Sequence, residues 1–224
     1  MKIIEAVKIR IEYKDGDDIL VALDNIDFHI NASELVAIVG PSGCGKTTLI
    51  NAIGLLLNVK NGEILIEGIN VTMLNEKNKS KLRNSFFGYL TQEFSLVEED
   101  SVFSNIRVPL LYSTNKLSKK KQRDLVKDYL EQLNLSSIID KKVKNLSGGQ
   151  RQRVALIRAI INNPKVIVAD EPTGSLDSET SKEIFNLLKG LVQEGVSILM
   201  VTHNMELANQ CDRIISMLDG KIRI

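Results

Sequence analysis

The sequence predicts an α/β fold with a parallel sheet at its core, an antiparallel β part at the N-terminus and a helical subdomain inserted into the chain. Residues 2–13 alternate apolar and polar side chains, and the alternation resumes at residues 26–30, which is typical of antiparallel strands. Three later runs are continuously apolar, the pattern of strands buried on both faces of a parallel sheet. These runs are residues 35–39, 166–169 and 197–201.

Helices follow two of the apolar runs. A glycine-rich turn leads into a helical pattern over residues 46–57, and apolar side chains spaced three and four apart predict a second helix from about Glu179 to Val192. Strand, helix and strand in this order predict a right-handed parallel crossover. The chain has 224 residues, and we expect a single domain over all of them.

The stretch from about residue 93 to 146 differs in character from the rest. It holds an acidic EED, a basic KLSKKKQR and an amphipathic helix. The apolar face of that helix comprises Leu125, Val126, Tyr129, Leu130 and Leu133. We interpret the stretch as an inserted helical subdomain and its lysine run as a solvated helix face. The catalytic core is then expected at residues 1–92 and 147–224.

Composition excludes several classes of protein. A net charge of +1 and 4% aromatic residues disfavour nucleic-acid binding. Two cysteines and two histidines, each isolated in the chain, disfavour a structural zinc site. The charged N-terminus does not resemble a signal peptide, and no apolar run is long enough to span a membrane. We therefore expect a cytoplasmic protein that reaches a membrane only through another chain.

A phosphate-binding loop follows the first buried strand. GPSGCGKTT matches G-x-x-x-x-G-K-[ST] between a predicted strand and a predicted helix, as that motif requires. It comprises Gly40, Pro41, Ser42, Gly43, Cys44, Gly45, Lys46, Thr47 and Thr48. Its backbone N–H groups can surround an anion, Lys46 can reach the terminal phosphates, and the Thr47 hydroxyl can meet Mg²⁺. We interpret Cys44 as a small filler rather than a nucleophile, since no neighbouring residue would act as its base.

Two adjacent carboxylates follow the second buried strand. Asp170 at the strand's carboxyl end is positioned to coordinate Mg²⁺. Glu171 beside it would orient or deprotonate water, since two carboxylates at the end of an apolar strand need a cation or a bound water. The alternative is that Glu171 is a surface residue beyond the strand.

Two more polar side chains are expected at the same sheet edge. His203 ends the strand LMVTH and becomes a candidate hydrogen-bond partner for a γ-phosphate beside the P-loop and the acidic pair. Without those neighbours, a structural role would be more common for such a histidine. Gln92, in FFGYLTQEF, ends another strand and could reach the metal or the attacking water.

A second anion site is predicted at NLSGGQ. Ser147 is a good helix cap, but Gly148 and Gly149 after it each cost a helix about 1 kcal/mol relative to alanine. Bare N–H groups at a helix start can close on a bulky anion, which would offset that cost. Since the P-loop already encloses the phosphates of one nucleotide, a second anion site suggests a second subunit.

The order GPSGCGKTT, Gln92, LSGGQ, VIVADE, SLD and His203 resembles the nucleotide-binding subunit of an ATP-binding cassette (ABC) transporter over almost the entire chain. This resemblance implies a P-loop NTPase (RecA-like) core and two subunits that sandwich ATP head to tail. Each ATP would lie between the P-loop of one copy and the signature of the other, Ser147, Gly148, Gly149 and Gln150.

The resemblance also implies roles for three further positions. Asp177 would help couple the two sites, and Gln92 would lie where nucleotide state is passed to a membrane subunit. Tyr13 matches the aromatic position that stacks on adenine, with core packing as its alternative. ATP and Mg²⁺ are the implied cofactors, and an integral membrane permease on the inner face of the cell membrane is the implied partner.

Within the superfamily, EPTGSLD and GYLTQEFSLVEEDSVFSNIRVPLLY most resemble the macrolide-export, lipoprotein-release and bacitracin-type peptide-export group. Two departures from that group are KKVKN, which lacks a proline, and Ser175 in place of a frequent asparagine. The implied function is an ATP-hydrolysing subunit that powers export or extraction of antimicrobial peptides, macrolides or lipoproteins.

Three alternatives stand beside the transporter. The first is an ATP-driven signalling subunit of a cell-division-type membrane complex. The second is a soluble ABC ATPase of DNA repair or translation. Repair proteins of this kind usually contain a long coiled coil and translation factors usually carry two cassettes, and the sequence shows neither feature. The third is a GTPase, but the sequence has no N-K-x-D motif to read guanine.

Overall fold

A four-stranded antiparallel sheet holds most of the N-terminal part of the chain. In this computed structural model, which describes residues 1–16 and 18–223, its strand order is β2-β1-β4-β5. The strands are β1 (Lys2–Asp15), β2 (Asp18–Asn31), β4 (Asn61–Ile66) and β5 (Ile69–Asn70). β1 and β2 form the long hairpin that the alternating pattern predicted.

A six-stranded sheet forms the core, with strand order β10-β9-β3-β8-β7-β6. Its strands are β3 (Leu35–Val39), β6 (Phe87–Thr91), β7 (Val166–Asp170), β8 (Ser197–Val201), β9 (Arg213–Leu218) and β10 (Lys221–Arg223). All neighbours pair in parallel except β10, which pairs antiparallel with β9. The predicted α/β class is confirmed.

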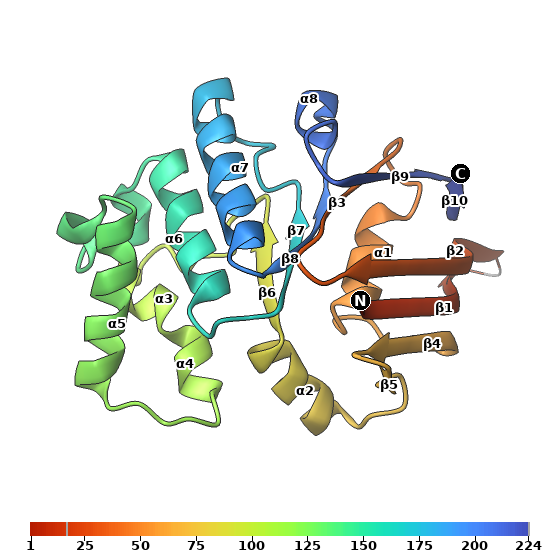
Figure 1. The fold of residues 1–224 in the computed structure, drawn as a ribbon, viewed down its shortest axis with the longest axis horizontal. Coiled ribbons are helices and arrows are strands. Elements are labelled where there is room, and N and C mark those ends of the chain that lie inside the picture. Colours follow the sequence, from red (N-terminus) through yellow and green to blue (C-terminus); the bar gives the residue numbers. More distant parts are fainter. Residues whose placement is uncertain (17, 224) are drawn as a thin grey trace.

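Each face of the core sheet is covered by a different layer (Figure 1). Val36, Val168 and Leu199 point to the face covered by α1 (Lys46–Ile53) and the antiparallel sheet. Ile167 and Met200 point to the opposite face, where the layer consists of α6 (Gly148–Ile160), α7 (Ser178–Gln193) and α8 (Met205–Ala208). Because both faces are buried, β3 is apolar at every position, and β7 and β8 are apolar except at Asp170 and Ser197.

Helix α1 ends earlier than the periodicity predicts. It stops at Ile53 instead of continuing to residue 57. Gly54 caps it, and Leu55 takes a left-handed backbone conformation with φ of 59°. A left-handed residue cannot continue a right-handed helix, so the chain turns away there.

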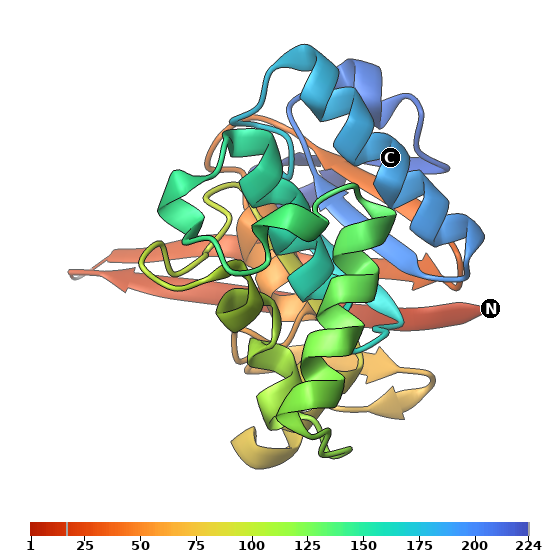
Figure 2. The ribbon, with the colours of Figure 1, turned by 90° about the vertical axis from the view of Figure 1, so that its left-hand side faces the viewer.

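The segment between β6 and β7 is helical. It contains α3 (Val102–Ile106), α4 (Val108–Tyr112), α5 (Lys119–Gln132) and two 3-10 turns at Ser136–Ile138 and Val143–Asn145. Figure 2 shows these green helices nearest the viewer, in front of the sheet. The predicted apolar face of α5 packs inward at Val126 and Leu130, and its lysine run is exposed.

The apolar cluster of this subdomain extends past the boundary expected at residue 146. Val154 and Ile157 of α6 pack into it, whereas Ala155 and Leu156 of the same helix pack against the core sheet. Helix α6 therefore belongs to both cores. Helix α2 (Glu76–Ser85) connects the antiparallel sheet to β6. None of the helices in the described ranges is both long and apolar enough to traverse a bilayer.

Candidate nucleotide site

The predicted P-loop connects β3 to α1 through a tightly enclosed turn. Gly45 has a φ of 102°, and a Cβ there would lie 2.4 Å from the carbonyl oxygen of Ala22. A Cβ on Gly40 would lie 2.3 Å from the carbonyl oxygen of Met217. Glycine is required at both positions because β2 and β9 approach the loop backbone too closely for any side chain.

Lys46 lies inside the loop rather than in solvent. Its side chain is buried, and Nζ donates to the carbonyl oxygens of Gly40 and Pro41, each at 2.8 Å. The buried Sγ of Cys44 lies 4.0 Å from the same ammonium. The loop therefore wraps around one positive charge at the N-terminal end of α1, where a phosphate would be attracted.

A cleft of about 420 Å³ opens beside the loop. Predicted residues that line it are Tyr13, Gly43, Gly45, Lys46, Thr47 and Thr48. The side chain of Tyr13 is 42% exposed, so the alternative of core packing is wrong and its ring is free to stack on a planar group. Sequence reasoning missed the remaining lining residues, Leu20, Val21, Ala22, Asp219 and Gly220.

The missed residues come from strand β2 and from the turn between β9 and β10, both of which border the loop. Gly220 N donates to the carbonyl oxygen of Cys44 at 3.1 Å, and Asp24 N donates to the carbonyl oxygen of Gly220 at 2.9 Å. The LDG turn before β10 was the only sequence feature that could have indicated this contact. It marks a turn, but which loop the turn touches depends on the tertiary fold.

The two carboxylates lie where the parallel strands end together. Asp170 pairs in register with Thr91 of β6 and Val201 of β8, so all three strands deliver their last residues to one edge. Glu171 is not a surface residue, because its side chain is only 15% exposed. Its backbone is left-handed, with φ of 49°, and its N–H donates to the Val201 carbonyl oxygen at 3.0 Å.

His203 and Gln92 join this edge as predicted. The Nε2 atom of His203 lies 3.0 Å from Oε1 of Glu171, although the pair is not aligned as a hydrogen bond. Gln92, Glu171 and His203 line one open cleft of about 730 Å³. Thr202 N donates to the carbonyl oxygen of Ile38 in β3 at 3.2 Å, so the strand that feeds the P-loop borders the same edge.

The signature segment begins α6 with a complete capping box. The Ser147 hydroxyl accepts from Gln150 N at 3.3 Å, and Ser147 N donates to Oε1 of Gln150 at 3.2 Å. A Cβ on Gly149 would lie 2.8 Å from Cγ2 of Thr180, so close packing against α7 explains that glycine in part. Gly148 is exposed, and a Cβ there would meet nothing closer than Cδ2 of Leu176, at 3.6 Å.

Asp177 caps the neighbouring helix α7. Its carboxylate accepts from Glu179 N, from Thr180 N and from the Thr180 hydroxyl, the last at 2.7 Å. These hydrogen bonds to Thr180 hold the pKa of Asp177 below its usual value. Asp177 is thereby linked to Gly149 through Thr180.

One chain does not bring the P-loop and the signature together. Helix α1 and helix α6 cover opposite faces of the core sheet (Figure 1). None of Ser147, Gly148, Gly149 and Gln150 lines the cleft beside the P-loop. The two predicted anion sites are therefore separate in the monomer.

Residues 23–174 match the family model described as ABC transporter. The chain belongs to the ABC transporter family. An uncharacterized ABC transporter ATP-binding protein of Methanocaldococcus jannaschii is 38% identical over 219 residues, which are 98% of this chain and 97% of that protein. The macrolide export ATP-binding/permease protein MacB of Pasteurella multocida is 39% identical over 98% of this chain, which spans only 34% of MacB.

Solved ABC cassettes have the same fold. The dimeric post-hydrolysis state of the cassette MJ0796 bound to ADP and Pi superposes with a TM-score of 0.92 at 35% identity, covering 99% of this chain and 97% of that one. The structure of cbiO1 from Clostridium perfringens, part of an ABC transporter complex, has a TM-score of 0.86 at 30% identity, covering 100% and 87%. The resemblance stated from the motifs is confirmed, and the chain is an ABC ATPase domain that binds ATP.

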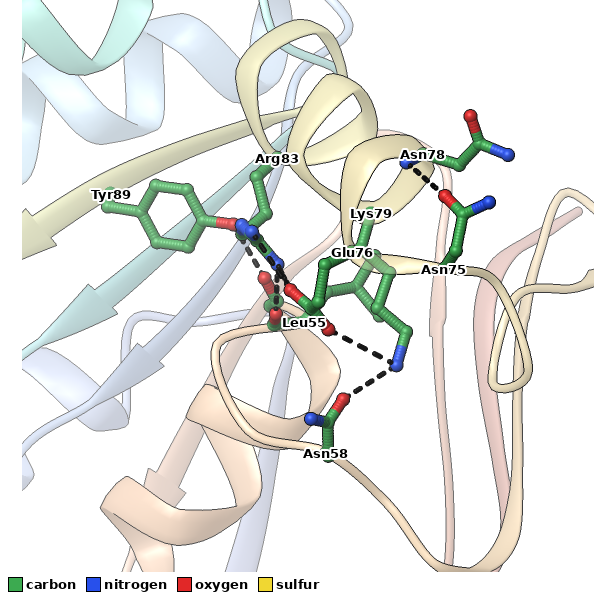
Figure 3. Close-up of polar contacts among 9 residues, drawn as sticks. Leu55, Asn58, Asn75, Glu76, Asn78, Lys79, Arg83 and Tyr89 are labelled. Atoms are coloured by element: carbon green, nitrogen blue, oxygen red, sulfur yellow. Dashed lines mark hydrogen bonds and ion pairs between the residues drawn. The ribbon is translucent and has the colours of Figure 1, made fainter.

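In this ABC cassette, polar side chains hold the far end of the P-loop helix α1 (Figure 3). The Tyr89 hydroxyl donates to the Gly54 carbonyl oxygen at 2.6 Å, and Arg83 donates to the Leu55 carbonyl oxygen at 2.9 Å. Lys79 donates to Oδ1 of Asn58 at 2.7 Å. Gly54, Leu55 and Asn58 follow Ile53, the last residue of α1, so these bonds fix the turn that leaves the helix. Burial raises the pKa of Tyr89, which keeps its phenol a donor.

Replacing Tyr89 by Phe is expected to lower the free energy of unfolding by about 1 kcal/mol, because the Gly54 carbonyl loses its partner while the ring is kept. Urea denaturation followed by circular dichroism measures the change. Tyr112→Phe is the control, since the Tyr112 side chain is 74% exposed. Equal stability of the two variants would contradict the structural role given to the Tyr89 hydroxyl.

Proposed function

We propose that the chain is the ATP-hydrolysing subunit of a membrane ABC transporter that exports or extracts substrates such as antimicrobial peptides, macrolides or lipoproteins. Similarity to MacB proteins supports the export class. The observation that carries the mechanism is the separation of the P-loop and the signature on opposite faces of one sheet. A complete site then needs two copies of the chain.

The nucleotide is proposed to occupy the cleft beside the P-loop. Its adenine would stack on Tyr13, and its phosphates would meet Lys46 and the backbone N–H groups of residues 40–48. The hydroxyl of Thr47, the carboxylate of Asp170 and the amide oxygen of Gln92 are hard oxygen donors, which suit Mg²⁺. Few protein ligands are needed, because phosphate oxygens and water commonly complete the shell of this ion.

Hydrolysis is proposed to use the carboxyl edge of the core sheet. Glu171 would orient or deprotonate the attacking water, and its low exposure beside the open cleft with Gln92 and His203 supports that role. His203 would donate to the γ-phosphate as charge develops there. In this proposal Mg²⁺ screens phosphate charge, and the chain's own side chains orient the water.

The signature half of the complete nucleotide site is proposed to come from a second copy of the chain. Exposed Ser147 and Gly148 would contact the γ-phosphate bound to the partner, with Gly149 and Gln150 completing the helix start. Asp177, linked to Gly149 through Thr180, would connect the two sites. The dimeric state of the MJ0796 cassette supports this arrangement.

A membrane permease is the other proposed partner. A groove of about 450 Å³ lies among α2, α4, β6 and α6, and its lining includes Leu56, Val108 and Tyr112. These side chains are exposed apolar groups, which favours contact with another protein. The permease would hold the chain at the inner face of the cell membrane.

Purified protein is expected to hydrolyse ATP only with Mg²⁺ present, at a rate per chain that rises with protein concentration. Phosphate release over a dilution series, with sedimentation to follow ATP-dependent dimers, tests this. Chelation with EDTA should abolish turnover, since the metal neutralises the phosphate charge that water must approach. A rate per chain that stays constant on dilution to monomers would refute the two-copy site.

A further inference from the structure

Gln152 is a fully buried amide one turn into the signature helix α6. Its side chain is 0% exposed, and its Nε2 donates to the carbonyl oxygen of Pro172. The reversed amide would set Oε1 against that carbonyl, so the contact defines the orientation. Among residues 1–16 and 18–223, Oε1 has no hydrogen-bond partner.

The carbonyl that Gln152 contacts belongs to a strained turn. Pro172 directly follows Glu171, whose φ of 49° is unfavourable for a residue with a Cβ. Such a conformation persists only when the surroundings hold it. Two bonds come from the sheet edge and the turn itself, Glu171 N to Val201 O and Gly174 N to Glu171 O, both at 3.0 Å.

Gln152 supplies a further bond to this turn, and this bond comes from the helix that the signature begins. Stability alone does not account for a buried amide here. An apolar side chain of similar length would fill the same space without desolvating a polar group. The amide instead fixes where the peptide after Glu171 lies relative to α6.

We propose that Gln152 is a positioning residue for Glu171, setting the orientation of its carboxylate from the signature helix. This inference rests on the water-orienting role given to Glu171 in the proposed function. In the two-copy site, the signature of a chain serves the partner's nucleotide while its Glu171 serves its own. Gln152 therefore connects the two sites. When α6 moves as its signature contacts the partner's phosphate, the Glu171 carboxylate in the chain's own site shifts with it.

Gln122 in α5 is a matched control within the same chain. It is 5% exposed, its Nε2 donates to the carbonyl oxygen of Leu117 at 3.0 Å, and its Oε1 also lacks a partner in the described part of the chain. It lines neither the P-loop cleft nor the Glu171 cleft. Gln152→Met and Gln122→Met thus remove the same kind of bond at two places.

The first measurement needs no catalysis. Amide hydrogen exchange of the segment 171–176, followed by mass spectrometry without nucleotide, is expected to be faster in Gln152→Met than in wild type and unchanged in Gln122→Met. Unchanged exchange in Gln152→Met would overturn the inference. If wild type hydrolyses no ATP while exchange changes as expected, the proposed function fails and the positioning role stands.

The second measurement separates positioning from stability. Gln152→Met is expected to lower kcat about tenfold to a hundredfold through misplacement of Glu171, with KM for ATP changed less than twofold. Gln122→Met should keep wild-type kcat even where both variants lose similar thermal stability. Equal kcat in the two variants would overturn the positioning role.

A third variant, Gln152→Glu, tests the hydrogen bond through the pH dependence of kcat, which would not change if Gln152 only filled space. A protonated carboxylic acid can donate to the Pro172 carbonyl, whereas a carboxylate repels it. Burial raises the pKa of a glutamate at such a position, so the kcat of the variant relative to wild type should fall as the pH rises from 6 to about 9. A ratio independent of pH would overturn the proposed hydrogen bond.

Discussion

Replacing Glu171 by Gln is expected to leave ATP binding intact and to lower turnover about 10²- to 10³-fold, the loss typical of one preorganised catalytic group. The amide keeps the shape of the side chain at the edge of the core sheet but can neither take a proton from water nor attract its hydrogens as strongly. Single-turnover phosphate release measures the chemical step, and equilibrium dialysis with ATP measures binding. ATP-bound dimers of the variant should accumulate.

Glu206→Gln is the control for this substitution. Glu206 borders the same cleft, but its side chain is 65% exposed and pairs with the exposed Lys182, at 3.4 Å. The Glu206→Gln variant should therefore keep wild-type turnover. If Glu171→Gln turns over as fast as Glu206→Gln, the water-orienting role of Glu171 is wrong.

Three strands of the core sheet, β3, β7 and β8, were predictable because their consecutive residues are apolar. The expected runs at 35–39 and 197–201 coincide with β3 and β8, since apolar layers cover both faces of each strand. The C-terminal end of α1 was not predictable in the same way. Apolar periodicity continues to residue 57, and only the left-handed backbone at Leu55 ends the helix.

The residues of the candidate site also differ in whether local sequence alone could identify them. Residues whose chemistry depends on local order, such as Lys46 after a glycine-rich turn and Asp170 at a strand end, were accessible to sequence reasoning. Gly220 and Gln152 were missed because each acts on a segment distant in the chain, the P-loop and the Glu171 turn. Gly149 was explained only by an anion, whereas Thr180 of α7 also excludes a side chain there.

The separation of the P-loop and the signature predicts that two inactive variants restore one another. Lys46→Met keeps the length of the side chain but removes the charge that the loop encloses, so phosphate binding should fail. Ser147→Asp keeps a good helix cap but places a negative charge beside the partner's phosphate. Each variant alone is expected to lose at least about 10²-fold in turnover.

Mixing the two variants in equal amounts should recover up to about a quarter of wild-type turnover. Random pairing of a two-fold dimer makes about half of the dimers mixed, and each mixed dimer has one site with an intact Lys46 and an intact Ser147. Recovery should grow with the time allowed for subunit exchange. A mixture no more active than its components would exclude a site shared between copies, because no monomer could then complete the site through its partner.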